Sequence, residues 1–195
     1  MRIKQDISVE VCAYSLISCL AADRAGADRV ELCASPHEGG TTPSTGLVKR
    51  VLADTRLEVH AMLRPRGGDF CYDATEKQTM LAEANDLVEA GVHGLVVGAL
   101  LPNGDLDVDF LADVKRVAQG VALTCHRAID VSREPLEVME QLIAIGFNRI
   151  LTSGCKDKAL DGIENIAELV AEAKGRIQIM AGSGVNPVNC LDFVQ

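Results

Sequence analysis

The sequence predicts an α/β protein, a (β/α)8 barrel of the TIM type with the eighth strand missing from this chain. Short apolar runs typical of β-strands alternate with amphipathic helical patterns along the whole chain, which indicates a parallel sheet. No GxGxxG turn follows the first strand, as an open dinucleotide-binding sheet would usually show. Polar residues instead collect where nearly every strand ends, which is where barrel active sites form.

The elements are expected in strict alternation. Seven strands are predicted at residues 9–14, 29–34, 57–63, 94–99, 121–126, 149–152 and 178–181. Six helices are predicted between them at 15–25, 45–54, 75–90, 107–118, 135–145 and 158–174. A seventh helix is expected to begin near Asn186 and Pro187, because Asn suits the cap position and Pro the first turn. With no linker in the chain, we expect one barrel domain over residues 1–195, incomplete at its C-terminus because such barrels usually need about 250 residues.

Composition narrows the classes of function. The net charge of −9 and an aromatic content of 3% argue against nucleic acid as a partner. No apolar run reaches the roughly 18 residues that span a bilayer, and no signal-peptide pattern begins the chain, so we expect a cytoplasmic protein that does not enter membranes. The seven cysteines include no CxxC pair, which favours free thiols over a disulfide framework. Cys19 and Cys190 fall in helical patterns and are expected to be packing residues.

A repeated acidic and thiol-bearing motif opens the chain. Val9-Glu10-Val11-Cys12 returns as Val30-Glu31-Leu32-Cys33 twenty-one residues later. Side chains alternate along a strand, so Glu and Cys of each copy share one face of the sheet. An outward-facing carboxylate would lie under helices at a high free-energy cost, so we expect both pairs to face the barrel interior.

Further polar residues follow the same alternation on later strands. His60, Met62 and Arg64 share one face of the third strand, and Thr124 shares a face with His126 on the fifth. Glu10 and Glu31 could pair internally with Arg64 or Arg127, or act in acid/base or metal chemistry. The thiols of Cys12 and Cys33 could simply pack, or could hold Cu(I), which soft ligands favour. Barrel shear is expected to offset the two cysteines by about one residue.

Several loops could bind an anion. Arg64, Arg66 and Asp69 belong to the run RPRGGDF after the third strand, which could fold over the barrel mouth around an anion or be held by Arg–Asp contacts. Residues 37–44 resemble a lid with a Gly-Gly pair, and Ser44 caps the next helix. The turns that contain Ser153 and Gly154, and Gly182, Ser183 and Gly184, could cradle a phosphate with backbone N–H groups.

Several of these motifs resemble the CutC copper homeostasis family. They are VEVC (9–12), ADRVELC (27–33), EGGTTPS (38–44), RPRGGDFCY (64–72), HRAID (126–130), LTSG (151–154) and IMAGSGV (179–185). The resemblance runs from Glu10 to the end of the chain and implies a cytoplasmic (β/α)8 barrel that forms dimers or higher homo-oligomers. It also implies a role in copper tolerance, with Cu(I) bound at Cys12 and Cys33. The chain departs from the family pattern by ending before the last strand.

Two main hypotheses follow, with a ligand-free scaffold as a third. In the first, the protein binds Cu(I) through Cys12 and Cys33, with His60, Met62 or His126 as secondary ligands and the two glutamates setting the local charge. In the second, it is an enzyme of unassigned reaction acting on a small anionic or phosphorylated substrate. Its base would then be Glu10 or Glu31 and its acid His60 or His126, while the substrate would be clamped by Arg64, Arg66 and Arg127.

Overall fold

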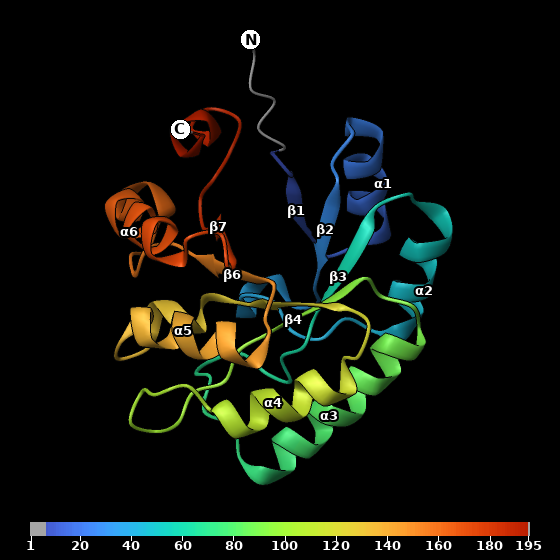
Figure 1. Cartoon of the computed structure of the whole chain (residues 1–195). Helices are drawn as coiled ribbons and strands as arrows, with labels where there is room; N and C mark the ends of the chain where they lie inside the picture. Colours follow the sequence, from blue (N-terminus) through green and yellow to red (C-terminus); the bar gives the residue numbers. More distant parts are fainter. Residues whose placement is uncertain (1–6, 195) are drawn as a thin grey trace.

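The computed structural model describes residues 7–194, and its seven strands form one parallel sheet in chain order. The strands are β1 (Glu10–Ala13), β2 (Arg29–Leu32), β3 (Glu58–Met62), β4 (Gly94–Val97), β5 (Ala122–Cys125), β6 (Arg149–Thr152) and β7 (Gln178–Ala181). Each expected strand is present, and where the bounds differ the observed strand is shorter by one or two residues at its ends. Within the described residues, β1 and β7 are the two edges of the sheet and stand apart from each other (Figure 1).

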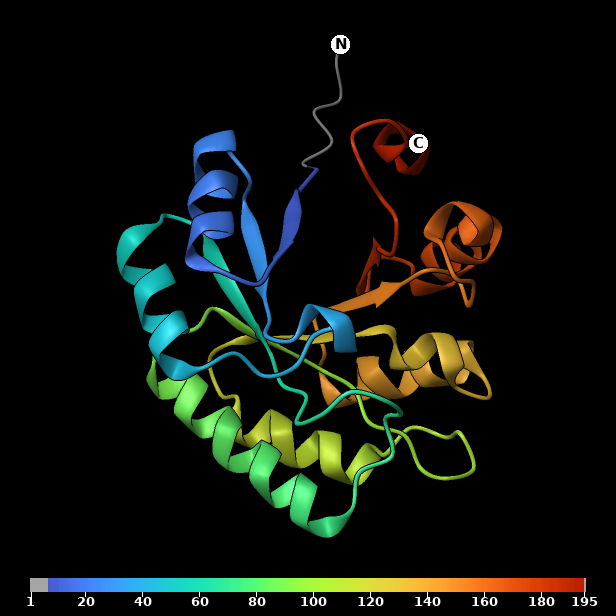
Figure 2. The same cartoon turned by 180° about the vertical axis from the view of Figure 1, so that it is seen from behind.

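Six α-helices cover the outer face of this curved sheet (Figures 1 and 2). They are α1 (Leu16–Ala25), α2 (Thr45–Asp54), α3 (Ala74–Glu89), α4 (Val108–Val117), α5 (Pro135–Ile145) and α6 (Ile163–Ala173). Short 3-10 helices follow β2 (Pro36–Glu38) and β5 (Arg127–Val131), and others lie at Ala159–Gly162 and Cys190–Phe193. The fold is therefore a TIM-type (β/α) barrel with seven of its eight strands, as predicted.

Local sequence signals explain where the helices begin and end. The side chain of Ser15 accepts a hydrogen bond from Ser18 N, which caps α1. Asp73 and Glu76 form a reciprocal capping box at the start of α3. Gly26 ends α1 with φ of 80°, a left-handed conformation that glycine adopts without steric cost. These contacts satisfy backbone groups that a helix terminus would otherwise leave without partners.

The two faces of the sheet carry different chemistry. The main hydrophobic core lies between the sheet and the helices and contains Val30, Val59, Leu95, Leu123 and Ile150, all fully buried. The next residue along several strands points to the opposite, inner face, because side chains alternate. Those inner residues include the buried polar groups Glu31, His60 and Thr124. A polar interior in place of the usual aliphatic layers marks the inside of the barrel as the place to look for function.

Two expected helices take a different form. The predicted helix at 158–174 is divided into the 3-10 turn Ala159–Gly162 and α6, because Gly162 approaches the backbone of Ser153 too closely for any side chain. The α-helix expected from Asn186 and Pro187 is wrong: a turn leads instead into the 3-10 helix Cys190–Phe193. Asn189 accepts from Asn186 N at 2.8 Å, and such local side-chain bonds favour turns over helix.

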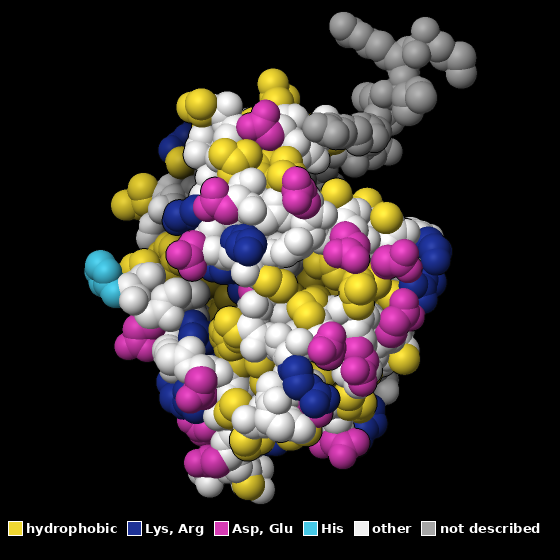
Figure 3. Space-filling view, turned by 90° about the vertical axis from the view of Figure 1, so that its left-hand side faces the viewer, with side chains coloured by type: hydrophobic (Ala, Val, Ile, Leu, Met, Phe, Trp, Pro, Cys, Tyr) yellow, Lys and Arg dark blue, Asp and Glu magenta, His cyan; other side chains and the backbone are white. Residues whose placement is uncertain are grey.

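One face of the molecule is mixed in charge. On the face shown in Figure 3, lysine and arginine side chains are interspersed with aspartate and glutamate. In the part of the chain that the structure describes, no helix combines the length and hydrophobicity that crossing a membrane would require.

Candidate functional site

Two thiols and a carboxylate converge on the inner face of β1 and β2. The sulfur atoms of Cys12 and Cys33 and a carboxylate oxygen of Glu31 all lie within 4.8 Å of one another. Cys12 is exposed, whereas Glu31 and Cys33 are buried. In the register, Cys12 is level with Glu31, so Cys33 lies two residues further along. The expected offset of about one residue between the two cysteines is therefore wrong. Residues level in the register share a face, so two inward-facing residues on neighbouring strands must be offset by an even number of residues.

The pKa values of all three groups are shifted from their usual ranges. The pKa of Cys12 is lowered to about 6, chiefly by the polar interaction with the neighbouring Cys33 thiol, and Tyr14 Oη lies 3.4 Å from the Cys12 sulfur. The same interaction, followed by burial, raises the pKa of Cys33. Burial, followed by the charge of Cys12, raises the pKa of Glu31 well above its usual range. These shifts favour the thiolate form of Cys12 and the protonated forms of Cys33 and Glu31.

A thioether and a close glycine complete this region. Cys33 and Met62 belong to a small buried cluster with Val96, against which Tyr14 packs. Gly40, with φ of 95°, passes directly over it: a Cβ there would lie 3.2 Å from Cys33 Sγ and 3.7 Å from Met62 Cε. The loop after β2, predicted as a lid, thus covers the buried sulfur with bare backbone.

Glu10 does not pair with Arg64 or Arg127, so that expectation is wrong. Nε of Arg29 lies 2.5 Å from Oε2 of Glu10, and the two residues are level in the register of β1 and β2. Arg29 also lies 3.7 Å from Glu58 on β3. No functional role is predicted for Arg29 from the sequence. Its position at the start of the second strand, directly before Val30 of the repeated motif, nevertheless indicates an inward-facing side chain.

Arg64 hydrogen-bonds to the backbone of two loops and does not pair with a carboxylate of the described residues. Its buried guanidinium donates to the carbonyls of Glu38 (2.7 Å), Gly40 (3.0 Å) and Gly68 (2.8 Å). It also lies 5.0 Å from the centre of the Phe70 ring, a cation–π distance. One side chain therefore joins the loop after β2 to the loop after β3.

The two predicted histidines are buried and neutral. His126 Nδ1 accepts from Ala128 N at 3.2 Å, which places the proton on Nε2, and burial lowers the pKa to about 3. Its ring packs 4.7 Å from that of Phe70. Burial also lowers the pKa of His60 to about 3. His60 packs on Gly94 of β4, where an added Cβ would lie 2.6 Å from the imidazole.

The remaining predicted anion ligands are engaged by the protein itself. Arg66 pairs with Glu76 at 2.5 Å and with Asp69 at 3.1 Å, as in the alternative of a loop held by Arg–Asp contacts. Arg127 pairs with Asp130 at 2.8 Å. Their role as anion ligands stays a prediction.

The turn after β6 holds a carboxylate of its own chain. The side chain of Asp130 accepts from Ser153 N at 3.0 Å, from Ser153 Oγ at 2.9 Å and from Cys155 N at 3.2 Å. Thr152 Oγ1 donates to the same carboxylate. Asp130 thus occupies the cradle predicted around Ser153 and Gly154, which a phosphate could enter only by displacing it.

The turn after β7 is more open. Ser183 Oγ donates to Asp157 O at 2.6 Å, and Gly182 N donates to Thr152 O at 2.9 Å. Gly184 packs against the stem of Lys158, and a Cβ there would lie 2.8 Å from its Cδ. Whether Gly182, Ser183 and Gly184 bind an anion stays a prediction.

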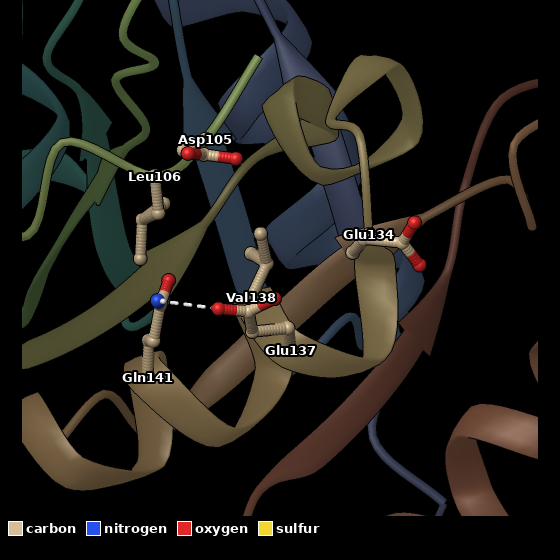
Figure 4. A pocket seen from close by; sticks show the side chains of 6 residues that line it. All are labelled: Asp105, Leu106, Glu134, Glu137, Val138 and Gln141. Carbon is tan, nitrogen blue, oxygen red and sulfur yellow. Dashed lines mark hydrogen bonds between the residues drawn. The ribbon is translucent and has the colours of Figure 1, made fainter. Parts of the chain in front are cut away.

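A separate shallow pocket beside α5, lined by Asp105, Glu134, Glu137 and their neighbours, lies outside the barrel (Figure 4).

Comparison with known proteins gives the same family throughout. The model of the CutC family matches residues 7–195. A family protein CutC from Parabacteroides distasonis is 48% identical over 182 residues, which cover 93% of this chain and 75% of the relative. One from Bacteroides thetaiotaomicron is 47% identical over 92% of this chain and 73% of its own length.

Solved structures agree. A crystal structure of a CutC protein from Streptococcus agalactiae, assigned provisionally to copper homeostasis, has a TM-score of 0.92 and 36% identity, and covers 97% of this chain and 93% of its own. An aldolase, QR15, has a TM-score of 0.73 at 15% identity, covers 99% of this chain and 88% of its own, and shows the barrel fold alone. With a family model spanning almost every residue and relatives near half identity, the chain belongs to the CutC family.

Proposed function

We propose that this protein acts in copper homeostasis by binding Cu(I) between Cys12 and Cys33. The observation that carries the proposal is the cluster of two sulfur atoms and one carboxylate oxygen within 4.8 Å of one another on the inner face of β1 and β2. The Streptococcus agalactiae relative, which carries a provisional copper homeostasis name, supports it. The proposal includes the cytoplasmic site of action and the homo-oligomer that the family resemblance implies.

The donor set suits a soft monovalent ion. Thiolate and thioether sulfur select Cu(I), whereas Zn²⁺ in structural sites usually takes four N or S ligands. Cys12 supplies a thiolate near neutral pH because its pKa is lowered to about 6. Met62 packs beside Cys33 and is a further soft donor. Glu31 has one buried carboxyl oxygen without a hydrogen-bond partner among the described residues, so it can donate to a ligand or adjust its proton when the ion enters.

The two arginines that follow β3 are bonded within the protein. Arg64 donates to backbone carbonyls of the loops after β2 and β3, and Arg66 pairs with Glu76 of α3. Cys33 must lose its proton to become a second thiolate ligand, so binding should release a proton and strengthen as pH rises.

The proposal is tested by an anaerobic competition titration with a chromogenic Cu(I) chelator. The wild-type protein is expected to hold about one Cu(I) per chain in competition, and Cys12→Ser and Cys33→Ser are each expected to lose it. Cys155→Ser is the matched control, because Cys155 is an exposed thiol outside the cluster. If the Cys12→Ser/Cys33→Ser double variant competes for Cu(I) as well as the control does, the proposal is wrong.

A second candidate, acid/base chemistry on a small anion, rests on one observation. His126 Nε2 is buried without a hydrogen-bond partner among the described residues, and the tautomer imposed by Ala128 N makes it a donor. A preorganised donor of this kind could stabilise a developing oxyanion. Screening phosphorylated metabolites by thermal shift would test it: a ligand that stabilises the wild type but not His126→Asn would support catalysis, and the absence of any stabilising metabolite would count against it.

A further inference from the structure

The barrel interior contains a set of buried polar atoms that the thiol cluster does not use. Among residues 7–194, hydrogen-bond partners are lacking for His60 Nδ1, Thr124 Oγ1, and Nε and Nη1 of Arg149. His60 is 1% exposed and Thr124 is fully buried. Nearly all buried polar groups in folded proteins have partners, so such a concentration inside one barrel calls for a ligand.

These groups lie on one inner surface. Thr124 of β5 is directly in register with Arg149 of β6, so their side chains share a face on neighbouring strands. His60 is in register with Gly94 of β4, and its ring packs over that glycine. His60 therefore shares the inner face with Thr124 and Arg149, and the charge of Arg149, after burial, lowers the pKa of His60.

Arg149 carries a charge that the protein does not neutralise by contact. No carboxylate oxygen of the described residues lies within 4 Å of it, although Arg29 on the same inner face holds both Glu10 and Glu58. Burial and the neighbouring charge of Arg29 both lower the pKa of Arg149. The charges of Glu10 and Glu58 oppose this shift, but both carboxylates lie against Arg29, so a bound anion would be the group in direct contact with Arg149.

We propose that the barrel interior binds a small oxyanion, a carboxylate or a phosphate, that accepts hydrogen bonds from Arg149 and Thr124 beside His60. Arginine matches both kinds of oxyanion, and a hydroxyl adds a neutral donor. The site shares no ligand with the thiol cluster and does not depend on copper.

The experiment measures thermal stability of the full chain against increasing sodium acetate or potassium phosphate, with sodium chloride added to constant ionic strength. A saturable rise in Tm is expected with at least one anion. Arg149→Gln is expected to abolish it, and Thr124→Val to weaken the apparent affinity about tenfold, the effect of losing one charge-assisted contact. Arg116→Gln, at a surface arginine paired with Asp113, is the matched control and should respond like the wild type.

A second readout does not depend on the variants folding. In the wild type, NMR signals of the His60 ring are expected to move on adding the anion, because a charge bound by Arg149 and Thr124 changes the electric field at the neighbouring imidazole. A response to acetate alone identifies a carboxylate site, and a response to phosphate alone a phosphate site. A non-saturable change in Tm with both anions, an unaltered response in Arg149→Gln, or His60 signals that do not move would each overturn the proposal. The Cys12→Ser and Cys33→Ser variants should retain the response, which separates this result from the copper test.

Discussion

Replacing Arg64 with glutamine should destabilise the protein far more than the same change at Arg50, an exposed arginine paired with Asp54. The guanidinium of Arg64 donates to three backbone carbonyls at 2.7, 3.0 and 2.8 Å, and glutamine can retain at most one of these bonds. Each bond from a charged donor is worth about 1.5 to 3 kcal/mol, so the loss of two predicts a fall of about 3 to 6 kcal/mol in the free energy of unfolding. The contact with Phe70 belongs to the same loss.

Equilibrium unfolding in urea at 25 °C measures this difference. Arg50→Gln is the matched control, because its ion pair with Asp54 on α2 is exposed and such pairs are worth about 0 to 1 kcal/mol. If the two variants lost equal stability, or if Arg64→Gln lost less than about 1 kcal/mol, Arg64 would not join the two loops as described.

Three further outcomes follow from the interior. The pKa values of His60 and His126 fall to about 3 on folding, so the unfolded chain binds more protons than the folded one below about pH 6.5. The free energy of unfolding, measured in urea, should therefore fall as pH drops from 7 toward 4, by about 1.4 kcal/mol per pH unit for each histidine. The fall should be less steep in His126→Asn. Gly94→Ala should cost about 1 to 3 kcal/mol, since the new methyl group meets the His60 ring; a neutral effect in thermal melts would show that the ring can move aside. Asp130→Asn should lower the free energy of unfolding by about 2 to 4 kcal/mol, because a carboxylate that accepts hydrogen bonds from Ser153 and its neighbours is replaced by an amide with one acceptor oxygen. Wild-type stability in this variant would contradict the role of Asp130 in holding the turn after β6.

Much of the fold and of the inner face was predictable from short-range patterns. The alternation of apolar strands and helices gave seven strands, and all seven are present. Strand parity alone placed Glu10, Cys12, Glu31 and Cys33 on one face, because alternation of side chains is a local geometric property.

The pairing of these side chains could not be predicted, because it depends on register and on rotamers set by distant residues. Glu10 pairs with Arg29 and not with Arg64, since Arg29 is level with it on the next strand. Asp130 reaches the turn at Ser153 across more than twenty residues of sequence, and no local signal marks that contact. That Arg149 has no carboxylate partner among residues 7–194 can be known only once every neighbouring carboxylate has been placed.

The central claim, that the inner face of β1 and β2 binds Cu(I) through two sulfurs, is tested most directly by X-ray absorption at the copper edge. The wild-type protein loaded with one equivalent of Cu(I) is predicted to show two sulfur ligands, and the Cys155→Ser control the same spectrum. A first shell of nitrogen or oxygen, or an unchanged sulfur shell in the Cys12→Ser/Cys33→Ser variant, would contradict the account.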